Sequence, residues 1–490
     1  MSNLNVKIGL EVHVQITSLK SKLFCSCSSE YRGKPPNTNV CPTCLGLPGA
    51  LPVVNIEAVK AALMVALALK CTISDVLVFS RKHYFYPDLV KNYQISQYDG
   101  IGSVAIARNG LMTINVDGKT KPIRIRRINI EEDPGKIIYP TGSLLTSKYT
   151  LIDYNRSGIP LLEIVSEPDL TNPKEARIFI DKLRSILEHI GLVNPELEGS
   201  IRVDANISLE GGSRVEVKNI SSSKDVERAL TYEIIRQSKA LEHGEVIRRE
   251  TRHWDDLKKV TISARVKELE EDYRYFPDPD LPPFKISKEL IEETASKLPE
   301  LPDQRVERFM KTYGLSEYLA NVLVSEKGLA DYFEDCVKIC GEPESIGNII
   351  VNDLKRWIDE LDLSIYEAIR LFPQKDLCQL VDLLNKNVIN IKILKEIIPR
   401  ALKSGKSAST IVYEEGYVDI SDEDVLLKII DEVIRENPKA VGDALTNPKA
   451  INYLVGQVMR KSKGRANPEL TNKLLIKRLN ELSRASSNAN

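Results

Sequence analysis

The sequence contains no apolar run long enough to cross a membrane. The longest run, residues 61–69, is flanked by Lys60 and Lys70, whereas a membrane-spanning helix needs about 20 apolar residues. The N-terminus, MSNLNVKIGLEVHVQI, also lacks the basic, apolar and small-residue order of a signal peptide. We therefore predict a cytoplasmic protein without a membrane partner, and a buried helix over residues 61–69.

A surplus of positive charge is also lacking. The 490 residues include 68 Lys and Arg against 69 Asp and Glu, a net charge of −1, which at first argues against a polyphosphate partner because such a partner must be met by cations. The charge is unevenly distributed near the C-terminus, however. Residues 411–448 contain 3 basic and 10 acidic side chains, whereas residues 449–490 contain 9 basic and 2 acidic ones.

Four cations concentrate the C-terminal surplus in the stretch RKSKGR: Arg460, Lys461, Lys463 and Arg465. Such a cluster can neutralise several phosphates without recognising bases. The alternative interpretation is a solvated basic end of a helix.

A standard nucleotide-binding loop is missing as well. Gly118-Lys119-Thr120 resembles the end of a P-loop, but Thr113 stands where its first glycine is needed. Gly405-Lys406-Ser407 fails in the same way, with Arg400 at that position. If the protein binds a nucleotide, we expect it to bind on a sheet.

The chain is long enough for about three domains. Short β-like runs dominate to about residue 280, and helical patterns follow from about Lys285. The proline-rich stretch FPDPDLPP, which cannot continue a helix or a central strand, marks one boundary, and SGKSAS at 404–409 marks another. These patterns predict an α+β domain over 1–284, a helical domain over 285–410 and a small helical tail domain over 411–490.

Residues 201–220 have the pattern of a β-hairpin. Apolar side chains alternate with Arg202, Asp204, Asn206 and Ser208, and Gly211-Gly212 supplies a turn before a second strand that carries Glu216 and Lys218. One face of this hairpin is therefore apolar and the other is ionisable. A solvated outer face is the alternative to a functional one, because antiparallel sheets often expose one side.

Two further β-like runs carry acids or histidine. Glu11 and His13 lie two residues apart, so on a strand they leave by the same face. Glu131, Glu132 and Asp133 end the run IRIRRINIEED, in which Glu132 shares a face with Ile128 and Ile130. Clustered acids repel one another unless a cation neutralises them, and Mg²⁺ takes oxygen ligands. The pattern indicates a magnesium site, although a structural role remains the alternative for each residue.

Four of the eight cysteines form a tight group: Cys25, Cys27, Cys41 and Cys44. Two closely spaced pairs suit a tetrahedral, structural zinc ion, whereas a catalytic zinc would need an open position. Reduced, unliganded thiols are the alternative. The other four cysteines are scattered in apolar surroundings, and in a reducing compartment a disulfide framework is not expected.

Several motifs resemble those of the B-subunit (GatB) family of aspartyl/glutamyl-tRNA(Asn/Gln) amidotransferases. They span nearly the whole chain in order: IGLEVHVQ (8–15), GLPGALPVVN (46–55), RKHYFYPDLVKNYQISQYD (81–99), EEDPGK (131–136), DYNRSGIPLLEIVSEPD (153–169), GSIRVDANISL (199–209), EVKNI (216–220), DYRYFPDPDLP (272–282) and YLVGQVMRKSKGRANP (453–468).

The resemblance implies a cradle-type catalytic domain with an antiparallel sheet, similar to glutamine synthetase and the guanidino kinases, followed by a helical and a tail domain. It implies that ATP phosphorylates the side-chain carboxylate of Asp on tRNA(Asn) or Glu on tRNA(Gln), and that ammonia then displaces the phosphate. It also implies a heterotrimeric complex with an amidase (glutaminase) subunit, which supplies ammonia, and a small third subunit. The misacylated tRNA is the further partner, and the tail domain would contact it.

Carried over by motif, the Mg²⁺ ligands and catalytic residues fall on Glu11, His13, Glu132 and Glu216, with Glu131 as the alternative to Glu132. Histidine is an unusual Mg²⁺ ligand, so Mn²⁺ remains an alternative ion. Five further residues are candidates for the ATP, phosphate or second-metal contacts: Lys82, Tyr84, Asp204, Lys218 and Arg274.

Two rival interpretations remain. One is a noncatalytic tRNA-binding scaffold, which the intact EVH, EED and EVK motifs disfavour. The other is the archaeal Glu-specific paralogue, whose extra inserted domain does not fit into 490 residues.

Overall fold

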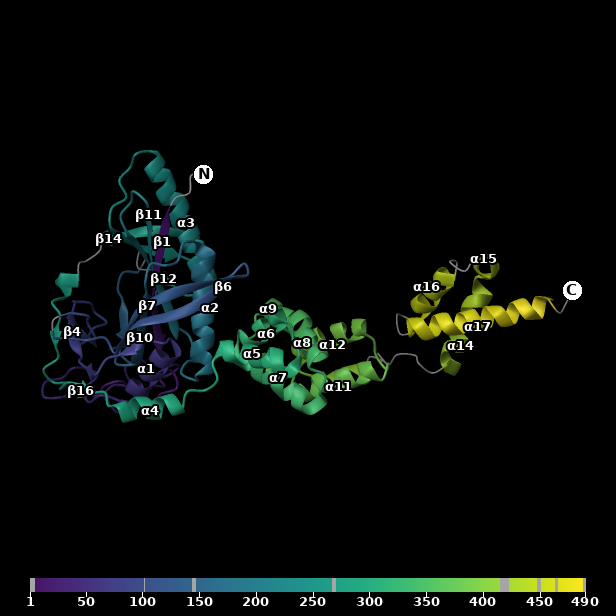
Figure 1. Cartoon of the computed structure of the whole chain (residues 1–490), viewed down its shortest axis with the longest axis horizontal. Coiled ribbons are helices and arrows are strands. Elements are labelled where there is room, and N and C mark those ends of the chain that lie inside the picture. Colours follow the sequence, from purple (N-terminus) through teal and green to yellow (C-terminus); the bar gives the residue numbers. More distant parts are fainter. Residues whose placement is uncertain are drawn as a thin grey trace. The chain divides into compact units, whose positions relative to one another are not determined.

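A computed structural model describes residues 5–100, 102–142, 147–266, 270–414, 423–446, 451–462 and 466–487 (Figure 1). The chain divides into two compact units, an N-terminal unit that ends at Gln304 and a C-terminal unit that begins at Arg305. This division falls later than the predicted boundary at 284/285. The reason is that helix α4 (Lys288–Ser296) packs Leu290 and Ile291 against the N-terminal core.

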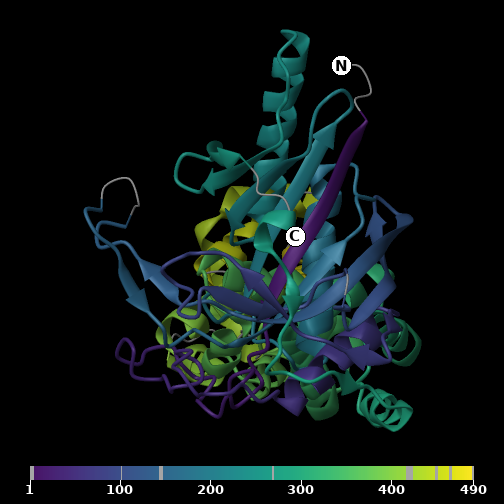
Figure 2. The ribbon, with the colours of Figure 1, turned by 90° about the vertical axis from the view of Figure 1, so that its left-hand side faces the viewer.

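A nine-stranded sheet forms the centre of the N-terminal unit, in the order β14-β13-β12-β11-β1-β10-β7-β6-β2. All neighbouring pairs are antiparallel except β12 and β13, which are parallel. In Figure 2 the purple strand β1 crosses the unit among strands of later colour. The strands are β1 (Val6–Gln15), β2 (Thr72–Ile73), β6 (Ala107–Val116), β7 (Lys119–Glu132), β10 (Pro160–Ser166), β11 (Ile201–Leu209), β12 (Val215–Ile220), β13 (Glu250–Asp255) and β14 (Val260–Val266).

Alternation of side chains gives the sheet one apolar face. On β1, Ile8, Leu10, Val12 and Val14 are buried in the core, as the period of two along a strand requires. Buried apolar side chains come to this core from α1 (Ile56–Ala68), α2 (Pro173–His189) and α3 (Ser223–Glu242), and α4 adds partly buried ones. Figure 1 shows α2 and α3 running alongside the sheet. The opposite face of β1 carries Glu11 and His13.

Three smaller sheets complete the unit. Strands β15 (Phe276–Pro277), β4 (Ser80–His83) and β5 (Tyr93–Ser96) form one of them. Hydrogen bonds from Gln94 and Ile95 of β5 to Glu132 tie this sheet to the end of β7. Strand β3 (Val76–Leu77) pairs with β16 (Phe284–Lys285), and β8 (Lys136–Ile138) pairs with β9 (Leu151–Asp153).

The C-terminal unit is helical, with separate apolar cores over 309–412 and 426–479. The first core is built from α5 (Pro302–Tyr313), α6 (Glu317–Val324), α7 (Lys327–Cys340), α8 (Pro343–Ile349), α9 (Lys355–Glu360), α10 (Ile365–Leu371), α11 (Gln374–Asn385), α12 (Ile391–Ser404) and α13 (Ala408–Glu414). The second is built from α14 (Glu423–Glu436), α15 (Pro438–Thr446), α16 (Ile451–Lys461) and α17 (Pro468–Ser487). No helix within the described residues has the length and apolar character needed to cross a bilayer.

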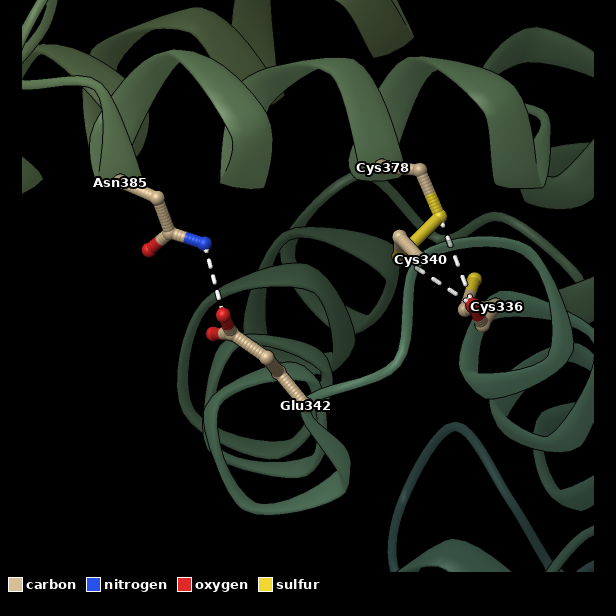
Figure 3. Close-up of a disulfide and its surroundings, with 5 residues drawn as sticks. All are labelled: Cys336, Cys340, Glu342, Cys378 and Asn385. Carbon is tan, nitrogen blue, oxygen red and sulfur yellow. Dashed lines mark hydrogen bonds between the residues drawn. A yellow bond between two sulfur atoms is a disulfide. The ribbon is translucent and has the colours of Figure 1, made fainter.

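A disulfide joins Cys340 at the end of α7 to Cys378 on α11 (Figure 3). The sequence analysis did not expect this bond, because the two cysteines are separated by 38 positions in the chain and no local pattern links them. The neighbouring Glu342 accepts a hydrogen bond of 2.8 Å from Asn385, which also connects this region to α11.

Candidate active site

A cluster of acidic side chains and one histidine lies on the polar face of the central sheet. Strand β1 places Glu11 and His13 there, and the antiparallel register puts Glu163 of β10 directly opposite His13. His13 Nε2 lies 3.5 Å from a Glu11 oxygen and 3.6 Å from a Glu131 oxygen. Ligand atoms of Glu11, His13 and Glu163 all lie within 4.8 Å of one another. We call Glu11, His13, Glu131 and Glu163 the acidic cluster.

The two adjacent acids at the end of β7 point to opposite faces of the sheet. Glu131 faces His13 and accepts a hydrogen bond of 2.9 Å from Ser96 Oγ. Glu132 instead pairs with Lys91 at 2.5 Å and accepts the Ile95 amide at 2.8 Å. The structure therefore brings Glu131, the alternative given by the sequence analysis, to the acidic cluster and places Glu132 elsewhere.

Crowding of the carboxylates separates their proton affinities. Burial raises the pKa of Glu11, but the charges of His13, Lys218 and Lys82 outweigh this effect and lower the pKa to about 2. Burial and the negative charge of Glu11 raise the pKa of Glu163 to about 7. Near neutral pH Glu163 can therefore take up a proton, which relieves the repulsion in part, and a divalent cation at this position would relieve it more directly. Three carboxylates and one imidazole form a donor set that fits Mg²⁺ or Mn²⁺.

Two lysines flank the acidic cluster. Burial lowers the pKa of Lys82, but Tyr275, Glu131 and Tyr84 raise it well above the ordinary value. Lys218 lies 2.9 Å from Asp204 and 3.8 Å from Glu216. Burial lowers the pKa of Lys218, whereas Asp204, Glu216 and Glu11 raise it by a larger amount. Both ammonium groups therefore stay charged and are suited to phosphate oxygens.

The other predicted site residues lie at different distances from this centre. Glu216 is buried on β12, where it accepts a hydrogen bond of 3.0 Å from Thr251 Oγ1. The Lys218 ammonium, 3.8 Å away, connects it to the acidic cluster. The Tyr84 ring lies 5.7 Å from the Lys82 ammonium. Arg274 is exposed, and its guanidinium lies 5.8 Å from the Phe85 ring rather than beside the carboxylates.

Sequence reasoning missed one buried acid of this region, Glu163, and named Asp133 only as one of three clustered acids. Glu163 is a single acid within the apolar run IPLLEIVS, and this interruption was the available signal. Asp133 is 0% exposed and accepts hydrogen bonds from Gln15 at 2.6 Å and from Arg202 at 2.7 Å. Because Arg202 pairs across the strands with His13, Asp133 anchors the wall of the site next to the histidine.

The four grouped cysteines meet in the loop region after β1. Their sulfur atoms all lie within 4.8 Å of one another, and the amide of Cys41 donates to Cys44 Sγ at 3.1 Å. Lys22 is 0% exposed, and its ammonium contacts the Asn39 carbonyl at 2.9 Å and Cys44 Sγ at 3.7 Å. A buried cation needs an anionic partner, so this lysine fits a tetrathiolate site with net negative charge.

The tail cluster is described only in part. Lys463 and Arg465 lie outside the described residues. Arg460 is exposed at the end of α16. Lys461 forms ion pairs with Glu432 and Glu436 of α14, at 2.8 and 2.6 Å.

Comparison with known proteins agrees with these observations. Residues 6–292 match the family model described as GatB/GatE catalytic domain, and residues 331–479 match the model described as GatB domain. The chain is 59% identical over 472 residues to the aspartyl/glutamyl-tRNA(Asn/Gln) amidotransferase B subunit of Sulfurisphaera tokodaii, covering 96% of this chain and 99% of the relative. The protein with this name from Thermotoga maritima is 48% identical over 480 residues, covering 96% and 98%. The chain therefore belongs to the family of aspartyl/glutamyl-tRNA(Asn/Gln) amidotransferase B subunits.

Proposed function

We propose that this chain is the component in which the side-chain carboxylate of Asp or Glu, esterified to tRNA, is activated by ATP and then amidated. An oxygen of the carboxylate attacks the γ-phosphorus, and the bond from this phosphorus to the ADP oxygen breaks. Ammonia then attacks the acyl carbon of the acyl phosphate, phosphate leaves, and the nitrogen loses a proton to give the amide. The first step is needed because a carboxylate oxygen is otherwise a poor leaving group.

The observation that carries this proposal is the acidic cluster between two charged lysines, within the part of the chain that matches a catalytic-domain family model. Glu11, His13, Glu131 and Glu163 would hold a divalent cation, which when bound offsets negative charge on the transferring phosphoryl group. Lys82 and Lys218 would bind phosphate oxygens. Asp204 would orient the Lys218 ammonium through their contact of 2.9 Å.

The ammonia source and the tRNA contact complete the proposal. The relatives are named as B subunits, which implies a complex of several different chains. We propose that a separate amidase chain hydrolyses glutamine to supply ammonia, that a small third chain joins the complex, and that the basic end of α16 contacts the tRNA. We further propose that Cys25, Cys27, Cys41 and Cys44 hold a structural zinc ion, supported by the approach of their sulfur atoms.

Glu11→Gln tests the proposal in the reconstituted complex. The variant should lose ATP-dependent amide formation on misacylated tRNA, because the carboxylate held most strongly ionised would be replaced by a neutral amide. Glutamine hydrolysis by the complex should remain, which shows that the components still assemble. Full amidation by the variant would remove the acidic cluster from the reaction and would favour a scaffold role for this chain.

A further inference from the structure

Two side chains from the loop of the four grouped cysteines reach the strand end beside the acidic cluster. We call residues 25–44 the cysteine loop. It is closed on itself, because the sulfur atoms near its two ends lie within 4.8 Å of one another. Tyr31 and Arg32 lie between the two cysteine pairs, and both side chains contact Gln15, the last residue of β1.

Gln15 uses every hydrogen-bonding position of its side-chain amide. The amide nitrogen donates to the Tyr31 hydroxyl at 3.2 Å and to Asp133 at 2.6 Å. The amide oxygen accepts from Arg32 at 2.5 Å and from the Tyr31 hydroxyl at 3.3 Å. A primary amide has two donor and two acceptor positions, and Gln15 is 1% exposed. The amide is therefore held in one orientation, because a rotation would leave buried polar atoms without partners.

Through Gln15 the cysteine loop is connected to three strands of the candidate metal site. The period of two places Gln15 on the same face of β1 as His13. Asp133 follows Glu131 by two positions and also accepts a hydrogen bond of 2.7 Å from Arg202. Arg202 lies on β11, directly opposite His13. One buried network therefore joins the ends of β1, β7 and β11, and β1 and β7 carry members of the acidic cluster.

The cysteine loop is itself fixed at this place. Arg32 donates two further hydrogen bonds to the Glu198 carbonyl, at 3.0 and 3.2 Å. Its guanidinium lies 4.7 Å from the centre of the Tyr31 ring, which is a cation–π contact. Near the other end of the loop, the Asn39 amide donates to Asn155 at 2.6 Å. Tyr31 and Arg32 thus approach Gln15 from a segment that is tethered on both sides.

We propose that Tyr31 and Arg32 are positioning residues for the divalent cation of the acidic cluster. They hold Gln15, and through it Asp133, so that the strand ends keep His13 and Glu131 at the spacing the ion needs. The inference rests on the proposed function, because that function supplies the cation. Residues that orient metal ligands typically change metal affinity by about 10–100-fold when they are replaced. The cysteine loop then acts on the reaction site in addition to stabilising the fold.

The test is a titration of the purified full-length chain with Mn²⁺, followed by electron paramagnetic resonance. Tyr31→Phe removes one hydroxyl and no charge. Arg32→Met removes the guanidinium and keeps an unbranched side chain. The control, Arg124→Met, removes the same charge and an ion pair with Asp169 from an exposed position in the same unit. Thermal unfolding of each variant shows that it is folded at the temperature of the titration, and Tyr31→Phe carries the test if Arg32→Met unfolds.

The two arginine variants separate positioning from a simple effect of charge. Removal of a positive charge would by itself strengthen the binding of a nearby cation. The positioning role predicts the opposite, so Arg32→Met should bind Mn²⁺ about tenfold more weakly than the unmodified chain. Tyr31→Phe should also weaken binding, and both variants should change the resonance spectrum of the bound ion, because that spectrum depends on the arrangement of the ligands. Arg124→Met should bind as the unmodified chain does.

Tighter binding by Arg32→Met, or unchanged binding by both loop variants, would overturn the proposal. An equal weakening in the Arg124→Met control would overturn it as well. The two proposals can fail separately. If Glu11→Gln binds Mn²⁺ as tightly as the unmodified chain, the acidic cluster is not the metal site and the proposed function fails. If Glu11→Gln loses Mn²⁺ whereas Tyr31→Phe and Arg32→Met keep it, the positioning proposal fails alone.

Discussion

Replacing Glu131 and Glu132 in turn should give opposite results, although the two residues are neighbours and chemically identical. Glu132→Gln leaves the Lys91 ammonium without its anionic partner, and both side chains are nearly buried, at 6% and 10% exposure. Removing one member of a buried ion pair typically costs 3–5 kcal/mol. The side-chain oxygen of the introduced Gln can still accept the hydrogen bond from the Ile95 amide, so we take the lower end of this range, a loss of about 3 kcal/mol. This corresponds to a fall in Tm of roughly 6–12 °C.

Glu131→Gln should change stability little, because Ser96 Oγ can still donate to the amide oxygen and one negative charge leaves a crowded group. Its effect should appear in metal binding, which should weaken about tenfold or more when an ionic ligand is lost. Calorimetry measures the first effect, and titration with Mn²⁺ followed by electron paramagnetic resonance measures the second. If Glu132→Gln abolishes Mn²⁺ binding and Glu131→Gln keeps it, the assignment of Glu131 rather than Glu132 to the metal site, which rests on the face of the sheet that each residue occupies, is refuted.

Three further predictions concern other parts of the chain. The purified protein should contain about one zinc ion per chain by the four-ligand argument, and Lys22→Met should speed its loss to a chelator; a zinc-free protein with unchanged Tm would leave the cysteines as ordinary thiols. Cys340→Ala should lower the free energy of unfolding of the C-terminal unit by about 2–4 kcal/mol, since the bond closes a loop of 38 positions, whereas an unchanged denaturation midpoint would show that the bond does not form. Burial raises the pKa of Glu334, but hydrogen bonds from Arg308 and Arg305 outweigh this effect and lower the pKa to about 2. The interaction of Glu334 with the two arginines therefore stabilises the fold fully above about pH 5, and this contribution is lost as the pH falls toward 2. Glu334→Gln should therefore destabilise the unit by on the order of 1–2 kcal/mol at pH 7, after allowing for solvent screening, and by almost nothing at pH 2; equal losses at both pH values would contradict this assignment.

Local alternation made several parts of the fold predictable. The hairpin predicted over 201–220 is confirmed as β11 and β12, because apolar and polar residues alternate along β11 and from Val215 to Lys218 of β12. The shared face of Glu11 and His13 is confirmed for the same reason, and α1 confirms the helix over 61–69. These features depend only on the period of a single strand or helix.

The same alternation already distinguished the two acids of β7. It placed Glu132 on the face of Ile128 and Ile130, which the structure shows to be the apolar face, and Glu131 on the other. The motif resemblance favoured Glu132, and that assignment stays a prediction which the geometry does not support. A residue's face was therefore better predicted by strand period than by motif position.

Features that depend on contact between distant segments could not be predicted. Glu163 reaches His13 only through the antiparallel register of β10 with β1. Lys91 meets Glu132 because the β4–β5 sheet docks on the end of β7. Cys340 and Cys378 meet because α7 packs on α11. No regular spacing of residues in the sequence indicates any of these contacts.

The central claim is that this chain activates a carboxylate by phosphorylation at the acidic cluster, and the fate of one oxygen atom tests it most directly. The complex is supplied with tRNA whose aspartyl or glutamyl side-chain carboxylate carries ¹⁸O at both oxygens, together with ATP and glutamine, and the released phosphate is analysed by mass spectrometry. The account predicts one ¹⁸O in each phosphate released with amide formation, and no labelled phosphate from a complex with Glu11→Gln. Amide formed with unlabelled phosphate, or labelled phosphate from the Glu11→Gln complex at the rate of the unmodified one, would contradict it.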